Sequence, residues 1–318
     1  MPLIASESNR ALQNPCVLLL VMLLNAACST AADGTDRAAL ETEVLEWRDD
    51  RRASLLAPTG FLNLAGLFWL DKDVTTFGSA ADNDLVFPAV ADAHIGRFRV
   101  TSDGVVMEPR EGVTVYSNEE PVGETLIADD TSDDPVMITH GSLAWTVIKR
   151  DGRYAVRLRD FDHPALASFP ELQYFPIDPA WRVEARLERY DEPRRVAAST
   201  VIEGLGWNPE SPGVAAFEKD GETYRLEAYT SGERLFFVFG DRTNRQETYP
   251  AGRFLYAAAP GKDGRIVLDF NRAYSPPCAF NDFSTCPVAA PRNRLPIRVT
   301  AGELYNRDAY VGNEGGYD

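Results

Sequence analysis

The chain of 318 residues has few lysines, histidines and cysteines, and each shortage excludes a class of protein. It carries four lysines against 28 arginines, has no polybasic run, and has a net charge of −16. Because phosphate neutralisation needs a basic face, we exclude nucleic acid as a partner. Three histidines and four cysteines, with no CxxC, supply few ligands for a metal. We therefore expect neither a metal nor another cofactor.

Sequence motifs of the common enzyme classes are also missing. The chain has no GxSxG, no Walker loop, no HExxH and no dinucleotide glycine fingerprint after a strand. Whether the protein is an enzyme therefore stays open from the sequence.

No hydrophobic run is long enough to cross a bilayer. The most apolar run, Val17–Leu24, has eight residues, whereas a spanning helix needs about 20. It follows Arg10 and precedes small residues, which is typical of an export signal. We therefore predict a signal peptide over residues 1–27 and a polar tether over 28–36.

The end of this signal, Ala26-Ala27-Cys28, resembles a bacterial lipobox, in which the cysteine is lipidated and becomes the new N-terminus. The resemblance implies a lipoprotein, and Ser29 after the cysteine favours the outer membrane, facing the periplasm. Secretion or release into the periplasm without a lipid is the alternative. The membrane, reached through the lipid anchor, is then a partner, and the sequence indicates no particular protein partner.

A helix is expected over residues 37–60. Leu40, Val44 and Trp47 fall on one helical stripe within Arg37–Leu56, and Pro58-Thr59-Gly60 ends the periodicity.

From Thr75 onward apolar and polar residues alternate at period 2, which indicates strands. The first half, residues 61–150, is expected to hold the strands Leu85–Phe87, Gly96–Val100, Val105–Glu108, Val113–Tyr116, Thr125–Ile127, Val136–Thr139 and Leu143–Lys149. The second half, residues 151–303, is expected to hold residues 153–160, Arg182–Tyr190, Val196–Glu203, Gly213–Lys219, Glu222–Thr230, Arg234–Gly240, Arg253–Ala258 and Ile266–Phe270.

This pattern predicts an all-β fold, mainly antiparallel, with one N-terminal helix and long proline-rich covering loops. The first half reads as a sandwich and the second as a meander or barrel, followed by a polar tail over residues 304–318.

One strand of the second half carries three arginines at period 2, namely Arg153, Arg157 and Arg159. Such a face suits an anion. Asp160 and Glu184 are equally available as neutralising partners, and we expect a neutralised surface.

The segment Asp269–Glu303 is rich in proline and aromatic residues and predicts an ordered loop over the β-core, ending in a strand over Leu295–Thr300. It holds Cys278 and Cys286, which we expect to form a disulfide. Closing this short loop is worth about 2.6 kcal/mol on a chain-entropy basis. Free thiols and a metal site are the alternatives.

Polar residues in and before this segment form the candidate ligand-binding site. Arg253 opens one strand and Asp269 ends the next, so antiparallel pairing is expected to bring them together. The candidates are Glu247, Tyr249, Arg253, Asp269, Asn271, Arg272, Asn293 and Arg294. Their donors suit a small polar or anionic ligand, and a purely structural network is the alternative.

Residues 77–100 (FGSAADNDLVFPAVADAHIGRFRV) resemble the core of a forkhead-associated domain, a β-sandwich that binds phosphothreonine. That family uses an arginine after the glycine and a Ser-Arg pair before the histidine. Here Ser79, Ala91 and Asp92 occupy those positions. The resemblance therefore implies a shared sandwich without phosphopeptide binding.

The segments GERLFFVFGDRTNRQETYPAGRFLYA and VLDFNRAYSPPCAFNDFSTCPVAAPRNRLPIRVTAGE resemble the domain of unknown function 1684 family. WRDDRRASLLAPTGFLNLAGLFWL and DPAWRVEARLERYDEP resemble its other blocks, so the resemblance covers residues 46–303. It implies no activity. We expect a non-enzymatic envelope module that binds a small polar or anionic ligand or a partner protein. The alternative is a metal-independent hydrolase using Glu247 and Asp269 with Arg253 and Arg294.

Overall fold

The structure, a computed structural model, describes residues 15–306, with side chains from residue 36 onward. The chain divides into two units, of which the first ends at Glu46 and the second begins at Trp47. The start of the predicted signal peptide and most of the predicted tail lie outside the described residues.

Helix α1 runs from Pro15 to Leu56, so it ends where the sequence predicted. A Cβ at Gly60 would stand 2.2 Å from the Leu55 carbonyl oxygen, so glycine is needed in the turn that follows. Residues 28–36, predicted as a tether, belong to this helix; they contain no proline to interrupt its hydrogen bonds. Within residues 15–306 no helix is long and apolar enough to cross a membrane.

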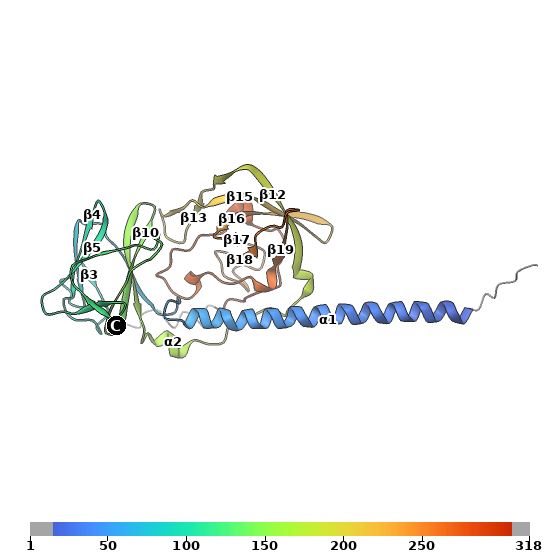
Figure 1. The fold of residues 1–318 in the computed structure, drawn as a ribbon, viewed down its shortest axis with the longest axis horizontal. Coiled ribbons are helices and arrows are strands. Elements are labelled where there is room, and N and C mark those ends of the chain that lie inside the picture. Colours follow the sequence, from blue (N-terminus) through green and yellow to red (C-terminus); the bar gives the residue numbers. More distant parts are fainter. Residues whose placement is uncertain (1–14, 307–318) are drawn as a thin grey trace, which may run out of the picture. The chain divides into compact units, whose positions relative to one another are not determined.

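The first half is a sandwich of two sheets, as predicted (Figure 1). Its strands are β1 (Leu64–Trp69), β2 (Val74–Gly78), β3 (Leu85–Val86), β4 (Gly96–Thr101), β5 (Gly104–Pro109), β6 (Val115–Ser117), β7 (Glu120–Val122), β8 (Thr125–Ile127), β9 (Met137–His140), β10 (Leu143–Arg150) and β11 (Arg153–Asp160). One sheet has the order β1-β11-β10-β9-β6-β7 and the other β3-β2-β4-β5-β8. Aromatic residues fill the space between them, with Phe77 stacked on Phe98 at 4.2 Å and edge-on to Trp145 at 5.4 Å.

Strand β11 belongs to this sandwich and not to the second half, where the sequence analysis had placed it. It pairs antiparallel with β10 through a two-residue turn, and with β1 on its other side. The turn residues Asp151 and Gly152 have φ values of 48° and 77°, as a tight hairpin between twisted strands requires.

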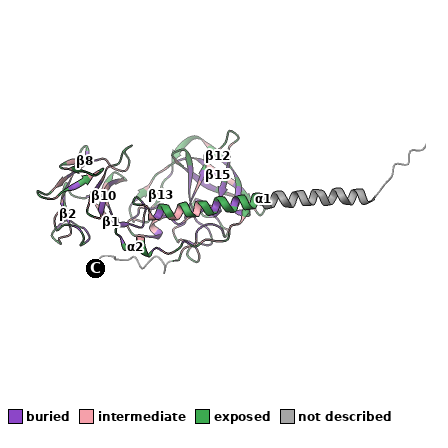
Figure 2. Ribbon diagram, turned by 60° about the horizontal axis from the view of Figure 1, so that its bottom comes forward, coloured by how far each residue is buried: buried purple, intermediate pink, exposed green. Residues whose placement is uncertain are grey.

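The second half is built on one antiparallel sheet with the order β18-β17-β16-β15-β12-β19, which curls until it is nearly barrel-shaped. Its elements are α2 (Pro164–Ser168), η1 (Pro179–Trp181), β12 (Arg182–Arg195), β13 (Ala198–Ser199), β14 (Gly206–Trp207), β15 (Glu210–Lys219), β16 (Glu222–Ser231), β17 (Arg234–Phe239), β18 (Arg253–Ala258), β19 (Arg265–Asp269), η2 (Phe270–Arg272), η3 (Pro277–Ala279) and η4 (Pro291–Asn293). Exposed and buried residues alternate over residues 182–187 of β12, and the rest of the strand is almost entirely exposed, seen as green ribbon in Figure 2. The predicted strand Val196–Glu203 is reduced to the two residues of β13.

The segment Asp269–Glu303 covers this sheet as an ordered loop with three short 3₁₀ turns. It contributes Phe270, Leu295 and Val299 to the core beneath it. The strand predicted at its end is absent over residues 295–300. Leu295 and Ile297 still bond to the backbone of Gly240 and Arg242, but at Val299 side chains take over. The Val299 amide donates to a carboxylate oxygen of Asp241, and its carbonyl accepts from Arg253.

Candidate functional site

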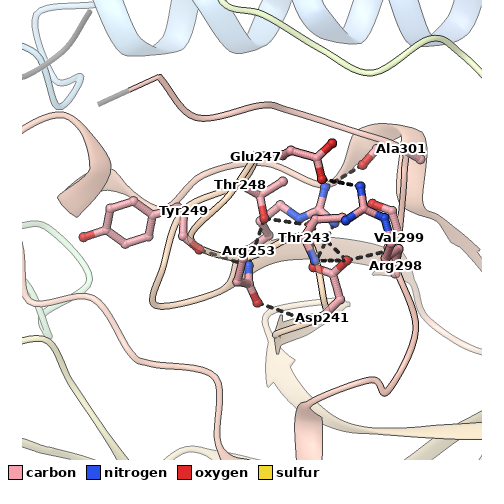
Figure 3. A network of polar contacts seen from close by, with 10 residues as sticks. Asp241, Thr243, Glu247, Thr248, Tyr249, Arg253, Arg298, Val299 and Ala301 are labelled. Carbon is pink, nitrogen blue, oxygen red and sulfur yellow. Dashed lines mark hydrogen bonds and ion pairs between the residues drawn. The ribbon is translucent and has the colours of Figure 1, made fainter. Parts of the chain in front are cut away.

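The structure does not gather the predicted residues into one site, and Arg253 lies in a closed network of polar contacts (Figure 3). The guanidinium lies 3.3 Å from an Asp241 carboxylate oxygen, and neither side chain is exposed. It also donates to the carbonyls of Ala301 at 2.5 Å and Val299 at 2.9 Å. Burial lowers the pKa of Arg253, and the charge of Asp241 opposes this shift. The arrangement joins the covering loop to the sheet and leaves no surface for a ligand.

The predicted Arg253–Asp269 pair is therefore wrong. Strand β18 pairs with β17 and β19 pairs with β12, so the two strands stand at opposite ends of the sheet order. Asp269 lies instead 3.5 Å from Arg272 and 3.7 Å from Arg182. Closeness along the chain had suggested a hairpin that the curled sheet does not form.

Asn271 and Asn293 are structural, since both are fully buried and bonded to backbone groups. The side-chain oxygen of Asn293 accepts from the backbone amide of Glu227 at 2.7 Å. Its side-chain nitrogen donates to the backbone carbonyls of Glu227 and Val238. In the same way, the side-chain oxygen of Asn271 accepts from the backbone amide of Asp178, and its side-chain nitrogen donates to the Asp178 carbonyl. Such bonds satisfy polar backbone where a sheet and an irregular loop meet. Arg294, by contrast, is exposed.

The two carboxylates proposed for a hydrolase line different surface clefts. Glu247 lies in a cleft of about 470 Å³ and forms an ion pair with Arg298 at 2.5 Å. Asp269 lines another cleft, of about 370 Å³, beside Arg182 and Arg272. Each carboxylate has its own arginine partner, so the structure does not bring them together as an acid and a base.

Tyr249, the remaining candidate, contacts the cysteine segment. Its hydroxyl donates to the Cys278 carbonyl at 3.0 Å, and its ring stands edge-on to Tyr305 at 5.0 Å. Cys278 and Cys286, hereafter the thiol pair, are free thiols in the structure. Their predicted disulfide stays a prediction. Within residues 36–306 no group of three or more His, Cys, Asp or Glu side chains is placed to hold a metal.

Two arginines on β11 form no ion pair with a carboxylate among the described residues. Val156 and Leu158 are buried in the sandwich core, so alternation turns Arg157 and Arg159 to the outer face of the sheet. Arg159 is 7% exposed and donates only to neutral acceptors, the Gly60 carbonyl and the Asn63 side-chain oxygen. We call Arg157 and Arg159 the arginine pair.

Among residues 36–306 no carboxylate forms an ion pair with either member of the arginine pair, and the buried Nε atoms of Arg157 and Arg159 have no hydrogen-bond acceptor. Burial lowers the pKa of Arg157 to about 10, with a further contribution from the charge of Arg150, while Asp130 and Cys286 oppose the shift. Burial also lowers the pKa of Arg159 to about 10, and the charge of Arg157 adds to the shift. Both shifts have desolvation as their largest cause, in keeping with the partly buried Arg157 and the buried Arg159 on the same strand face.

The neutralised surface expected for this strand is thus found at Arg153 alone, which pairs with Asp71 at 2.9 Å. Asp160 follows Arg159 directly, so its side chain points to the opposite face of the strand. Glu184 pairs with Arg265 at 3.3 Å. The alternation rule was a signal in the sequence that excluded Asp160 as a partner.

In the part that resembles a forkhead-associated domain, polar side chains are used within their own turn. The Ser79 hydroxyl donates to the Ala91 carbonyl at 2.8 Å, and the Asn83 amide donates to the carbonyls of Ala80 and Ala93. His94 lies 3.3 Å from the Asn83 side-chain oxygen. These contacts give His94 and Ser79 structural partners, and the resemblance to the forkhead-associated family stays a prediction.

The fold is that of a mainly antiparallel β protein, and the arginine pair lies on the sandwich in its first half. Residues 167–304 match the sequence profile of a family described as "Protein of unknown function (DUF1684)", and the chain belongs to this family, as its sequence predicted. The matched range covers the second half and its covering segment.

Among solved structures the chain is similar to the solution NMR structure of the uncharacterized protein from gene locus rrnAC0354 of Haloarcula marismortui. The two are 32% identical over 43% of this chain and 78% of that chain, with a TM-score of 0.37. A comparison with curated proteins gave no match.

Proposed function

We propose that this protein is a non-enzymatic β module that binds a small oxyanion, a carboxylate or a phosphate, through the arginine pair. The observation that carries the proposal is that Arg157, partly buried, and Arg159, buried, lie on one face of β11 and form no ion pair with a carboxylate among the described residues. Removing a charge from water costs several kcal/mol unless an opposite charge compensates it. A bound oxyanion supplies that charge.

The same chain neutralises arginines that are buried for structural reasons. Arg253 meets Asp241, and Arg51, whose side chain is 9% exposed, meets the buried Glu303 at 3.3 Å. The arginine pair departs from this pattern. The fork of a guanidinium also matches the two oxygens of a carboxylate or phosphate, which favours an oxyanion over a halide.

Thermal unfolding in the presence of inorganic phosphate or succinate tests the proposal, with sodium chloride at equal ionic strength as the reference. We expect either oxyanion to raise the melting temperature of the wild type, because it binds only the folded state. Arg157→Met should lose this response. Arg153→Met is the matched control, since it removes an arginine on the same strand face that already has a partner.

Two results would count against the site. One is an equal anion response in Arg157→Met and the wild type. The other is a wild type that neither phosphate nor succinate stabilises beyond chloride.

We further propose that this module belongs to the cell envelope. The support is the sequence of residues 1–28, which resembles an export signal ending in a lipidated Cys28. An outer-membrane anchor facing the periplasm follows from that resemblance, and secretion without a lipid is the alternative.

A further inference from the structure

The thiol pair is a second chemical feature, and it lies on the covering loop rather than on β11. The Cys278 amide donates to the Cys286 sulfur at 3.2 Å, which places the sulfur of one cysteine against the backbone of the other. Cys286 is 5% exposed, whereas Cys278 is partly exposed in the same apolar cluster. The two thiols are thus neighbours with unequal access to solvent.

The side chain of Asn281 makes four hydrogen bonds that stabilise the loop between the cysteines. The Asn281 side-chain oxygen Oδ1 accepts from the Phe283 backbone amide and the Ser284 hydroxyl, both at 2.9 Å. Its side-chain nitrogen Nδ2 donates to the Pro277 carbonyl at 3.1 Å and to the Phe61 carbonyl at 3.0 Å. The chain on either side of the loop is also fixed, because the Cys286 carbonyl accepts from the Val201 amide at 2.9 Å. The sulfurs are held close without a covalent bond.

We propose that Cys278 and Cys286 are a reversible dithiol–disulfide site, in which Cys278 attacks an external disulfide and Cys286 resolves the product. In the first step the Cys278 thiolate attacks one sulfur of a small-molecule or protein disulfide. A mixed disulfide forms and one external thiolate leaves. In the second step the Cys286 thiolate attacks the Cys278 sulfur, and the second external thiolate leaves. The protein loses two electrons and two thiol protons, and the external disulfide becomes two thiols.

The surroundings of the sulfurs support these roles. The pKa of Cys278 is below its ordinary value because of a hydrogen bond from the Cys286 thiol; burial opposes the shift, and the Tyr249 hydroxyl adds to it. The charge of Asp282 acts in the opposite direction. The pKa of Cys286 is raised by its hydrogen bond with Cys278 and by burial, with the charge of Arg157 opposing. Because the thiolate is the attacking species, Cys278 is the first to react.

The test is a redox titration of the full-length protein in mixtures of reduced and oxidised glutathione. Samples are quenched in acid, alkylated and analysed by mass spectrometry. We expect the wild type to pass from two alkylatable thiols to none as the oxidised fraction rises, and to return when it falls. Cys286→Ser should accumulate a mixed disulfide with one glutathione at Cys278. Cys278→Ser should accumulate much less, because Cys286 is buried and its pKa is raised.

Three results would overturn the proposal: two thiols that persist at every glutathione ratio, a bridge that reduced glutathione cannot open, or equal trapping in both serine variants. The melting temperature of each variant shows whether it is folded. Should one serine variant fail to fold, the wild-type titration decides reversibility, and the rate at which iodoacetamide modifies each wild-type cysteine decides their order.

Discussion

The guanidinium of Arg253 lies 3.3 Å from the carboxylate of Asp241, and solvent reaches neither side chain. This ion pair links the first residue of β18 to the segment after β17, and through Val299 and Ala301 to the covering loop. The pair thus has a structural role, because it holds the covering loop against the sheet.

Breaking this pair from one side should destabilise the protein strongly. Asp241→Asn or Arg253→Met leaves a buried charge or its carbonyl partners uncompensated, at a cost of about 3–5 kcal/mol in the free energy of unfolding. The double variant should cost less than the sum of the two single variants. Urea denaturation measures all three. The exposed Glu188–Arg225 pair is the control, and Glu188→Gln should leave the midpoint almost unchanged. Additive effects of the two single variants would show that the residues act separately.

Glu303 predicts a pH dependence of stability. Burial raises the pKa of this carboxyl above its ordinary value, although Arg51 and Ser275 oppose the shift. The folded state therefore holds the proton more tightly than the unfolded state. Stability must fall as pH rises from the unfolded value, near 4.5, through the raised folded value.

The free energy of unfolding, measured across this pH range, should show that fall for the wild type. Glu303→Gln cannot titrate at this position and should lack this part of the slope. Parallel pH profiles for the two proteins would exclude Glu303 as its source.

Arg157→Met should stabilise the protein when no oxyanion is present. It removes a desolvated charge that has no ionic partner among the described residues, which is worth about 1–3 kcal/mol. Since the folded-state pKa of Arg157 is about 10, below its ordinary value, the penalty is fully present below pH 10 and shrinks only above it. The gain should therefore be constant from pH 6 to pH 9 in urea denaturation without added anions. A loss of stability there would indicate that Arg157 already has a partner within the chain.

Tyr249→Phe should slow the alkylation of Cys278 by iodoacetamide at neutral pH. The hydroxyl donates to the Cys278 carbonyl beside the thiol and lowers the pKa of Cys278, so its removal should raise that pKa. The pH profile of the alkylation rate measures the shift. Tyr256→Phe serves as the control, because Tyr256 packs at the same apolar cluster. The same profile for Tyr249→Phe and the wild type would remove Tyr249 from the thiol site.

Cys28→Ala should release the protein from the membrane fraction of a cell that processes lipoproteins. The lipid on Cys28 is the anchor that the sequence of the signal predicts. Fractionation with immunodetection is the measurement. A wild type that is already in the soluble fraction would contradict the lipoprotein prediction.

The strands and hairpins were predictable from sequence because their signals are local. Alternation at period 2 marks β10, β15 and β16, and Asp-Gly pairs mark the tight turns between strands. Asp220 and Gly221, for example, have φ values of 54° and 81° between β15 and β16. Such a turn depends on its own residues and on no distant part of the chain. The covering loop was likewise indicated by its prolines and aromatic residues.

Partner choice among the charged residues was not predictable. Which carboxylate meets Arg253 depends on how far the sheet curls and which strands lie at its ends, and packing of the whole second half decides this. The arginine pair shows the same limit. Its place on one strand face follows from alternation, but its burial without a carboxylate depends on what packs against that face. A period of two residues assigns a side chain to a face, whereas desolvation and charge pairing arise only when distant segments come together.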